Sequence, residues 1–461
     1  MPIQRPTTAI IGAGISGLTT GKMLSDYGIP YTCFETSDRI GGNWAFGNPN
    51  GHSSAYRSLH IDNSKSVCRF FDFPMPEGYP DFPHHSEIKA YLDAYAETFG
   101  LLDSIEFENG AVHAERRTGG GWDLTDQRGD TRSFDALVVA NGHHWNPRMA
   151  DFPGQFSGEV IHSHYYVDPT HPLDLRGKRI LVVGFGNSAV DIACELSQKS
   201  LGNTLTLSTR SGAWVVPKYL FGRPIDEFYG DGHALDFLPP HWHRRLLRNL
   251  PKWVSGDPVK YGLPQPNHHY GESHTTMSSE IYLRIGSGDI TPKPNVEHLD
   301  GATVRFTDGT ASDFDVIIYA TGYDITFPFF DPGFLAAPAN RFPLYKRMMR
   351  PDIDDLLFVG FAQAVPTLFP FVECQARLVA AYLAGTYRPP TPAEMERVIA
   401  EDEQRYIGHV LDTPRHTQQV DYFHYEKSMK TQELPAGLQR ARDLGPVPLA
   451  GRTSDALSVA V

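Results

Sequence analysis

Short apolar runs alternate with amphipathic stretches in two parts of the chain. The first run, residues 8–11, leads into a glycine loop, a predicted helix over 16–27 and a second predicted strand over 31–35. The same order recurs between residues 179 and 208. Apolar runs of this length beside a helical period are typical of βαβ units. The pattern therefore predicts an α/β fold with two Rossmann-like units.

Two further apolar runs, 136–140 and 316–320, each end in a turn and are expected to be buried parallel strands. Because the second unit lies between parts of the first, we predict a discontinuous domain at 1–165 and 325–461. The inserted domain is then 166–324.

Residues 215–284 of the inserted domain form an irregular stretch rich in Pro, Gly, His and aromatic residues. It is too long for a simple connection and predicts an insertion with a functional role. Near the end of the chain, 391–406 predicts an amphipathic helix, and the tail beyond it shows no clear period.

The first glycine loop carries Gly12, Gly14 and Gly17 between the predicted strand and helix. In a dinucleotide site these glycines allow the tight turn, the approach of a pyrophosphate and close packing of helix on strand. The spacing alone is weak evidence, since it also fits a plain turn. Glu35 at the end of the next strand is the acid expected on a ribose hydroxyl, and this context favours a dinucleotide site.

A Gly-Gly pair follows the acid, and then a tryptophan. Gly42 and Trp44 resemble the second flavin-contact motif of FAD monooxygenases, which favours FAD in the first unit. The alternative interpretation is a simple turn with a tryptophan in the core.

The second loop has an analogous pattern but no acid after its second strand. Arg210 and Ser211 stand there instead, and a guanidinium with hydroxyls complements the 2′-phosphate of NADP. NADPH is therefore preferred over NADH, the alternative being that Arg210 is a solvated surface charge. The predicted contacts in the loop itself are Gly184, Gly186, Asn187 and Ser188.

Charge and cysteine usage narrow the range of partners. The net charge of −13 and a pI near 5.8 disfavour nucleic acid and anionic membranes. No apolar stretch is long enough to cross a bilayer, and the four cysteines form no Cys-x-x-Cys pair. A cytoplasmic protein is expected, without a redox dithiol. The scattered histidines lack the clustering of a metal site, so no metal is predicted.

Between the two loops, Phe156, Gly158, His162 and Tyr166 form a motif. This motif resembles the identifying motif of the flavin-containing monooxygenases. Residues 58–65, 293–296, 320–323 and 373–377 resemble segments of the same family. The resemblance spans about residues 8 to 428.

This resemblance implies an NADPH domain inserted into the FAD domain. It also implies that His162 is a structural link rather than a proton donor. The FAD contacts implied are Gly12, Gly14, Gly17, Glu35, Gly42, Trp44, Leu59, Asn63, Val112, Thr321 and Gln375.

The resemblance further implies a reaction. NADPH reduces the flavin, the reduced flavin takes up O₂ as a C4a-hydroperoxide, and an amine nitrogen or sulfide sulfur of a small molecule accepts one oxygen atom. Asn63 is the candidate catalytic residue, because an amide donates and accepts hydrogen bonds without titrating. Local sequence alone equally supports a turn-forming asparagine.

Two other functions stay open at this point. Baeyer–Villiger monooxygenases share both loops, although their comparable motif typically ends in Trp where this chain has Tyr166. A flavoprotein that senses redox state without turnover is the alternative of another class. Assembly as a homodimer is left open, and no apolar membrane anchor is expected over 453–461.

Overall fold

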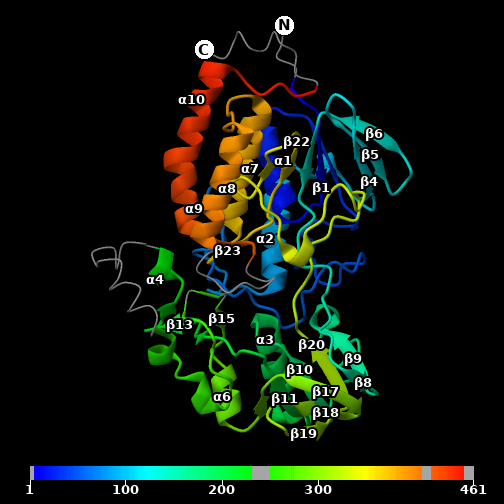
Figure 1. Ribbon diagram of the computed structural model, residues 1–461, viewed down its shortest axis with the longest axis vertical. Coiled ribbons are helices and arrows are strands. Elements are labelled where there is room, and N and C mark those ends of the chain that lie inside the picture. The colour runs from blue at the N-terminus through cyan, green and yellow to red at the C-terminus, as the bar shows by residue number, and fades with distance from the viewer. Residues whose placement is uncertain (1–4, 231–249, 271, 274, 408–416, 451–461) are drawn as a thin grey trace. The chain divides into compact units, whose positions relative to one another are not determined.

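The computed structural model describes residues 5–230, 250–270, 272–273, 275–407 and 417–450 and separates into two compact units (Figure 1). Unit 1 comprises Met1–Ser53, Lys65–His144 and Ile325–Val461. Unit 2 comprises Ser54–Ser64 and Trp145–Asp324. Two of these boundaries differ from the predicted domains: unit 2 begins near Trp145 rather than 166, and it also includes Ser54–Ser64.

The central sheet of unit 1 has the strand order β21-β22-β7-β1-β2-β3. Its inner strands are parallel, and β1 and β7 are buried along their whole length, as the continuous apolar runs predict. The bounds are β1 Thr8–Ile11, β2 Tyr31–Phe34, β3 Ile105–Glu106, β7 Ala136–Val139, β21 Met349–Arg350 and β22 Ile353–Phe358.

Helices α1 and α7 pack against each other in unit 1, and a three-stranded antiparallel sheet, β4-β5-β6, precedes β7 in the chain. The bounds are α1 Ile15–Asp26, α2 His85–Thr98, α7 Phe369–Ala384, α8 Pro392–Tyr406, β4 Ala111–Arg116, β5 Trp122–Asp126 and β6 Thr131–Phe134. The helix predicted at 391–406 is confirmed, with Thr391 as its N-cap.

The tail that shows no clear period in the sequence has regular structure over residues 419–444. Strand β24, Gln419–Asp421, pairs with β23, Gln363–Val365, and two helices follow, α9 Tyr422–Ser428 and α10 Leu434–Leu444. A π-helical turn at Met429–Glu433 separates them. This turn breaks the 3.6-residue period, so the two helices share no continuous apolar stripe in the sequence.

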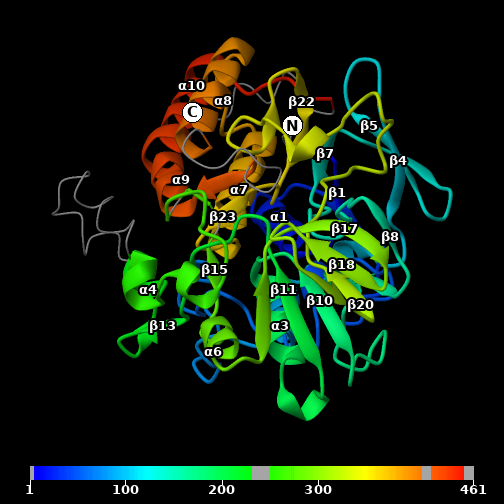
Figure 2. The ribbon, with the colours of Figure 1, turned by 60° about the horizontal axis from the view of Figure 1, so that its bottom comes forward.

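Unit 2 contains a parallel sheet of order β16-β11-β10-β20-β9, with α3 after β10 (Figure 2). The strands and helix predicted between 179 and 208, and the strand at 316–320, are confirmed within a residue or two at each end. The bounds are β9 Glu159–His162, β10 Arg179–Val183, α3 Asn187–Leu196, β11 Thr204–Ser208, β16 Ile290–Lys293 and β20 Val316–Tyr319.

A second sheet of unit 2 has the order β19-β18-β17-β8, and it joins the face of the parallel sheet through a buried apolar cluster. Its antiparallel strands β17, β18 and β19 come just before β20, which pairs with β10, the strand that leads into the second glycine loop. In unit 1 the β4-β5-β6 sheet likewise comes just before β7, which pairs with β1. The bounds are β8 Gly154–Phe156, β17 Val296–Gly301, β18 Thr303–Phe306 and β19 Ala311–Asp313.

The stretch predicted as an irregular insertion, 215–284, contains only short elements in its described part. Residues 231–249, 271 and 274 of it lie outside the described residues. Its elements include β12 Val215–Val216, β13 Tyr219–Leu220, β14 Arg223–Pro224, α4 Glu227–Gly230, the 3-10 helix Pro258–Tyr261, β15 Thr276–Met277 and α6 Ile281–Gly286. Over the described residues, no helix combines the length and apolar character needed to cross a membrane.

The buried carboxylate of Asp355 on β22 anchors the β4-β5-β6 sheet. It accepts hydrogen bonds from Arg116 Nε at 2.8 Å, the Gly121 amide at 2.8 Å and Trp122 Nε1 at 3.2 Å. Trp122 Nε1 also donates to the backbone oxygen of Asp355 at 3.0 Å, so the buried donor that depends on the carboxylate is the Gly121 amide.

We expect Asp355→Ala to lower the free energy of unfolding by about 2 to 3 kcal/mol, because it leaves the buried Gly121 amide and the Arg116 guanidinium without this acceptor. Thermal or urea unfolding measures the loss. Asp123→Ala removes a half-exposed carboxylate of the same sheet, which accepts from the exposed Ser133 hydroxyl at 2.6 Å and pairs with Arg117 at 3.7 Å, and it should change stability by less than about 0.5 kcal/mol. Equal effects of the two substitutions would contradict the anchoring role.

Candidate functional site

The first glycine loop has room only for glycine at two of its three predicted positions. Gly12 has φ +101°, and a β-carbon there would lie 2.8 Å from the carbonyl oxygen of Ala140. A β-carbon on Gly17 would lie 1.8 Å from the Gly12 oxygen. The tight turn and the close helix packing expected of these positions are therefore both present.

The N-terminus of α1 is left open by this loop. Its N-cap residue is Gly14, which provides no side-chain hydrogen bond, and the first turn contains no acidic residue. By contrast, α2 and α8 are closed by capping boxes, formed by His84 with Glu87 and by Thr391 with Glu394. The free N–H groups and the positive helix end of α1 therefore fit the pyrophosphate of a dinucleotide.

Glu35 lies at the end of β2 and is almost fully buried. Its carboxylate accepts hydrogen bonds from the Ala13 amide at 2.7 Å and the Ser37 amide at 2.8 Å. Burial raises the pKa of Glu35, and these two donors oppose the rise. The acid is thus tied directly to the glycine loop, in the position from which a carboxylate binds ribose hydroxyls.

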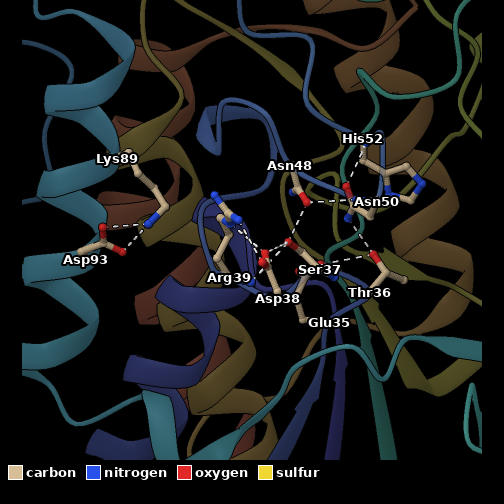
Figure 3. Close-up of polar contacts among 10 residues, drawn as sticks. All are labelled: Glu35, Thr36, Ser37, Asp38, Arg39, Asn48, Asn50, His52, Lys89 and Asp93. Carbon is tan, nitrogen blue, oxygen red and sulfur yellow. Dashed lines mark hydrogen bonds and ion pairs between the residues drawn. The ribbon is translucent and has the colours of Figure 1, made fainter.

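Polar side chains that the sequence did not predict hold the chain just after Glu35 (Figure 3). The Ser37 hydroxyl donates to Asn48 Oδ1 at 2.6 Å, and Asn50 Nδ2 donates to the Thr36 hydroxyl at 2.8 Å. These contacts join residues more than ten positions apart in the sequence, so no local spacing reveals them. They fix the turn that presents the acid.

The Gly-Gly pair packs against the first loop. The Gly41 amide donates to the Ala13 oxygen at 3.0 Å, and Gly42, with φ +54°, faces Gly14 so closely that a β-carbon on Gly42 would lie 3.1 Å from the Gly14 α-carbon. Trp44 ends the short 3-10 helix that follows and is half-buried. Trp44 is therefore not fully buried in the core.

The second loop repeats the geometry of the first. Gly184 has φ +130°, and a β-carbon there would lie 2.4 Å from the Ala320 oxygen. Helix α3 begins after Gly186 with no side-chain cap and no acid in its first turn, and Ser188 in that turn is exposed. This helix end also fits a pyrophosphate.

Arg210 follows β11 at the position that Glu35 occupies after β2. Its side chain is exposed, and no carboxylate among the described residues pairs with it. Among the residues that the structure describes, the neighbouring Ser211 hydroxyl makes only a long contact of 3.5 Å with the Gly212 oxygen. An unpaired guanidinium beside a hydroxyl fits the 2′-phosphate of NADP.

The motif residues between the loops serve the internal structure of unit 2. A β-carbon on Gly158 would lie 2.5 Å from the Asp315 oxygen and 2.7 Å from the Phe156 ring. His162 is buried, and burial lowers its pKa to about 4. The buried Tyr166 donates its hydroxyl to Glu195 on α3 at 2.7 Å. A histidine that is neutral at pH 7 is a poor general acid, in keeping with the structural role expected of His162.

The other predicted FAD contacts fall in both units. Val112 lies on β4 of unit 1 and is 48% exposed. Gln375 on α7 is fully buried and accepts from the Gly360 amide at 2.9 Å, so its effect would come through the backbone that it holds. Leu59, Asn63 and Thr321 belong to unit 2, which contains the second glycine loop.

Asn63 differs from its neighbours in having a free side chain. It is half-buried, and no residue of the described chain hydrogen-bonds to its amide. Asp62 and Ser64 on either side are both bound, to Asn187 and Asp226 respectively. An amide held by its neighbours but without a protein partner is available to a ligand.

Asp191 and Asp226 are further acids at this site that the sequence did not predict. Burial raises the pKa of each carboxyl, and each accepts a hydrogen bond from the Ser54–Ser64 segment. Their partners are distant in sequence, so only the fold reveals them. No cluster of three or more His, Cys, Asp or Glu side chains suited to a metal occurs among the described residues.

Two open dinucleotide loops in one chain define a flavoprotein with a nicotinamide site, and comparison with known proteins gives the family. The flavin-binding monooxygenase-like family model matches residues 6–434, and the chain belongs to this family. Members of this family use FAD and NADPH as cofactors.

Similar proteins of known sequence include mammalian members of the family. Dimethylaniline monooxygenase (N-oxide-forming) 2 of Rattus norvegicus is 35% identical over 445 residues, which cover 90% of this chain and 80% of the relative. Flavin-containing monooxygenase 5 of Oryctolagus cuniculus is 33% identical over 443 residues, with the same two coverages.

Solved structures show the same fold. S-allyl-L-cysteine S-oxygenase from Allium sativum has a TM-score of 0.69 at 25% identity and covers 94% of this chain and 90% of its own. Cyclohexanone monooxygenase also has a TM-score of 0.69, at 16% identity and with 95% and 98% coverage. At that identity the second likeness shows the fold alone.

We expect Arg210→Ala to raise the KM for NADPH by about tenfold or more and to leave the KM for NADH nearly unchanged. A charge-assisted hydrogen bond to the 2′-phosphate is lost, and NADH has no such phosphate. Steady-state kinetics with both nucleotides measures the difference.

Arg305→Ala is the matched control, because Arg305 is an exposed arginine on β18 of the same unit. It should change neither KM. A parallel rise of both values in Arg210→Ala would contradict the assignment of the phosphate to Arg210.

Proposed function

We propose that this monooxygenase oxygenates a soft nucleophile, an amine nitrogen or a sulfide sulfur, on a small molecule. The flavin supplies the redox chemistry when bound, taking hydride from NADPH and passing one oxygen atom of O₂ to the substrate. The observation that carries the proposal is the amide of Asn63, which has no hydrogen-bond partner among the described residues and lies in unit 2 with the second glycine loop.

The residues around the two loops bind and orient the cofactors. The open helix ends of α1 and α3 bind pyrophosphates, Glu35 accepts from a ribose, and Arg210 neutralises a 2′-phosphate. These contacts position reacting groups without themselves exchanging protons, and positioning of this kind supplies much of the catalytic effect.

Asn63 suits a site that must hold an oxygen-bearing group without protonating it. Its amide offers donors and an acceptor and does not titrate, so it stabilises polar groups at any working pH. His162 is a poor alternative, because its pKa of about 4 leaves it neutral and it is buried within unit 2. Asn63 is therefore the candidate catalytic residue.

Heteroatom oxygenation is favoured over oxygenation of ketones by the closeness of the relatives. The proteins at 33–35% identity include those named for N-oxide formation, and the garlic protein at 25% is named as an S-oxygenase. The cyclohexanone monooxygenase is similar at 16% identity, which supports a shared fold. Tyr166 also favours heteroatom oxygenation, because the comparable motif of Baeyer–Villiger monooxygenases typically has Trp at this position.

We also propose a cytoplasmic location, supported by the four free cysteines, three of them buried. Assembly as a homodimer stays a prediction. Small-molecule substrate and O₂ are the partners that a monooxygenase requires.

The reaction is tested with the purified flavoprotein. NADPH added without oxygen should bleach the flavin absorbance, and in air an amine or sulfide should be oxygenated with little H₂O₂ released. A cyclic ketone should react more slowly than either. Absence of bleaching with NADPH and with NADH would favour a redox sensor, and a faster reaction with the ketone would favour Baeyer–Villiger oxygenation.

We expect Asn63→Ala to retain FAD but to release most of the NADPH-derived electrons as H₂O₂, because the amide no longer stabilises the oxygen-bearing group. The ratio of product to NADPH consumed is the measurement, with peroxide assayed in parallel. Ser58→Ala alters an exposed residue of the same segment and should remain coupled. Full coupling in Asn63→Ala would rule out its catalytic role.

A further inference from the structure

The segment Ser54–Ser64 leaves unit 1 and packs on unit 2 before the chain returns to unit 1 at Lys65. Tyr56 is buried in the core of unit 2, and Leu59 packs against that core. The Tyr56 hydroxyl donates to Asp191 Oδ2 at 2.6 Å, and Arg57 Nε pairs with Asp168 at 2.9 Å. The start of the segment is therefore fixed to unit 2.

The end of the segment is fixed on both sides of Asn63. Asn187 Nδ2 donates to Asp62 Oδ2 at 2.5 Å, and the Ser64 amide donates to Asp226 Oδ2 at 2.5 Å. Lys218 Nζ also donates to the Ile61 oxygen at 3.1 Å. These contacts set the backbone on which the Asn63 amide depends, without using that amide.

The hydrogen bond of Asp62 is made with the helix that follows the second glycine loop. Asn187 is the first residue of α3, and its Oδ1 accepts from the Met277 amide at 3.0 Å. Both ends of the Asn187 side chain are thus occupied, one by Asp62 and one by β15. A nucleotide bound at the N-terminus of α3 would therefore lie against the same residue whose side chain donates to Asp62.

We propose that Asp62 is a positioning residue that couples the binding of the nicotinamide nucleotide to the placement of Asn63. This inference rests on the proposed function for its effect on turnover, and on the Asp62–Asn187 contact for its structural part. By linkage, a nucleotide that stabilises the segment is itself bound more tightly when the segment is attached. Loss of the contact should weaken both effects together.

The structural part is tested by hydrogen exchange of residues 54–64 in the FAD-loaded protein, with and without NADP⁺. In the unmodified protein NADP⁺ should slow exchange of this segment. In Asp62→Ala the segment should exchange roughly tenfold faster, NADP⁺ should protect it little, and the Kd for NADP⁺ should rise. Asp62→Asn keeps an acceptor for Asn187 and should restore most of the protection.

The catalytic part is read from the same variants as the ratio of product to NADPH consumed. Asp62→Ala should release more H₂O₂, and Asp62→Asn should recover coupling. Asp300→Ala, which removes an exposed carboxylate of unit 2, should behave as the unmodified protein in every assay.

The outcomes separate the two proposals. If exchange, NADP⁺ affinity and coupling are all unchanged in Asp62→Ala while Asn63→Ala is uncoupled, the positioning role is overturned and the proposed function stands. If the unmodified protein oxygenates no substrate, the proposed function fails, and the exchange measurements still decide whether Asp62 links the nucleotide to the segment.

Discussion

Both units depend on the close approach of a glycine loop to the carbonyl group that follows the neighbouring strand. A β-carbon would lie 2.8 Å from the Ala140 oxygen at Gly12 and 2.4 Å from the Ala320 oxygen at Gly184, so no larger residue fits without displacing backbone. This approach brings each helix N-terminus to the carboxyl edge of its sheet. Because glycine occupies each N-cap, the helix ends keep unmade N–H groups for an anion.

The two units use one scaffold with opposite charge at one position. The order β22-β7-β1-β2-β3 in unit 1 corresponds strand for strand to β9-β20-β10-β11-β16 in unit 2. After the second strand of each βαβ unit, one scaffold has Glu35, buried and tied to its loop, and the other has Arg210, exposed and unpaired with any described carboxylate. A carboxylate accepts hydrogen bonds from hydroxyl groups and repels a phosphate, whereas a guanidinium binds a phosphate. The two sites would thus differ at this position in their preference for a ribose hydroxyl or a phosphate, and the two residues are readable from the sequence.

What the sequence predicts well is what neighbouring residues determine. The strands at Thr8–Ile11 and Arg179–Val183 and the loops after them follow from local apolar runs and glycine spacing. The attachment of Ser54–Ser64 to unit 2 could not be predicted, because its contacts, such as Tyr56 with Asp191, join residues 135 positions apart. The helices after Tyr406 were hidden for another reason, since the π-helical turn at Met429–Glu433 interrupts the period by which helices are recognised.

The contacts around Asn63 explain why polar groups rather than apolar packing alone attach its segment. Burial of Tyr56 and Leu59 is non-directional and would tolerate small shifts of the chain along the surface of unit 2. Hydrogen bonds at Asp62 and Ser64 have defined distances and angles, and they act on the two residues adjacent to Asn63. Burial of Asp226 carries a desolvation cost, visible as the raised pKa of its carboxyl, which the Ser64 amide partly offsets. The hydrogen bonds of these acids therefore give a defined position to the Asn63 amide, which has no protein partner in the described chain. A defined position is what an amide that contacts a cofactor requires.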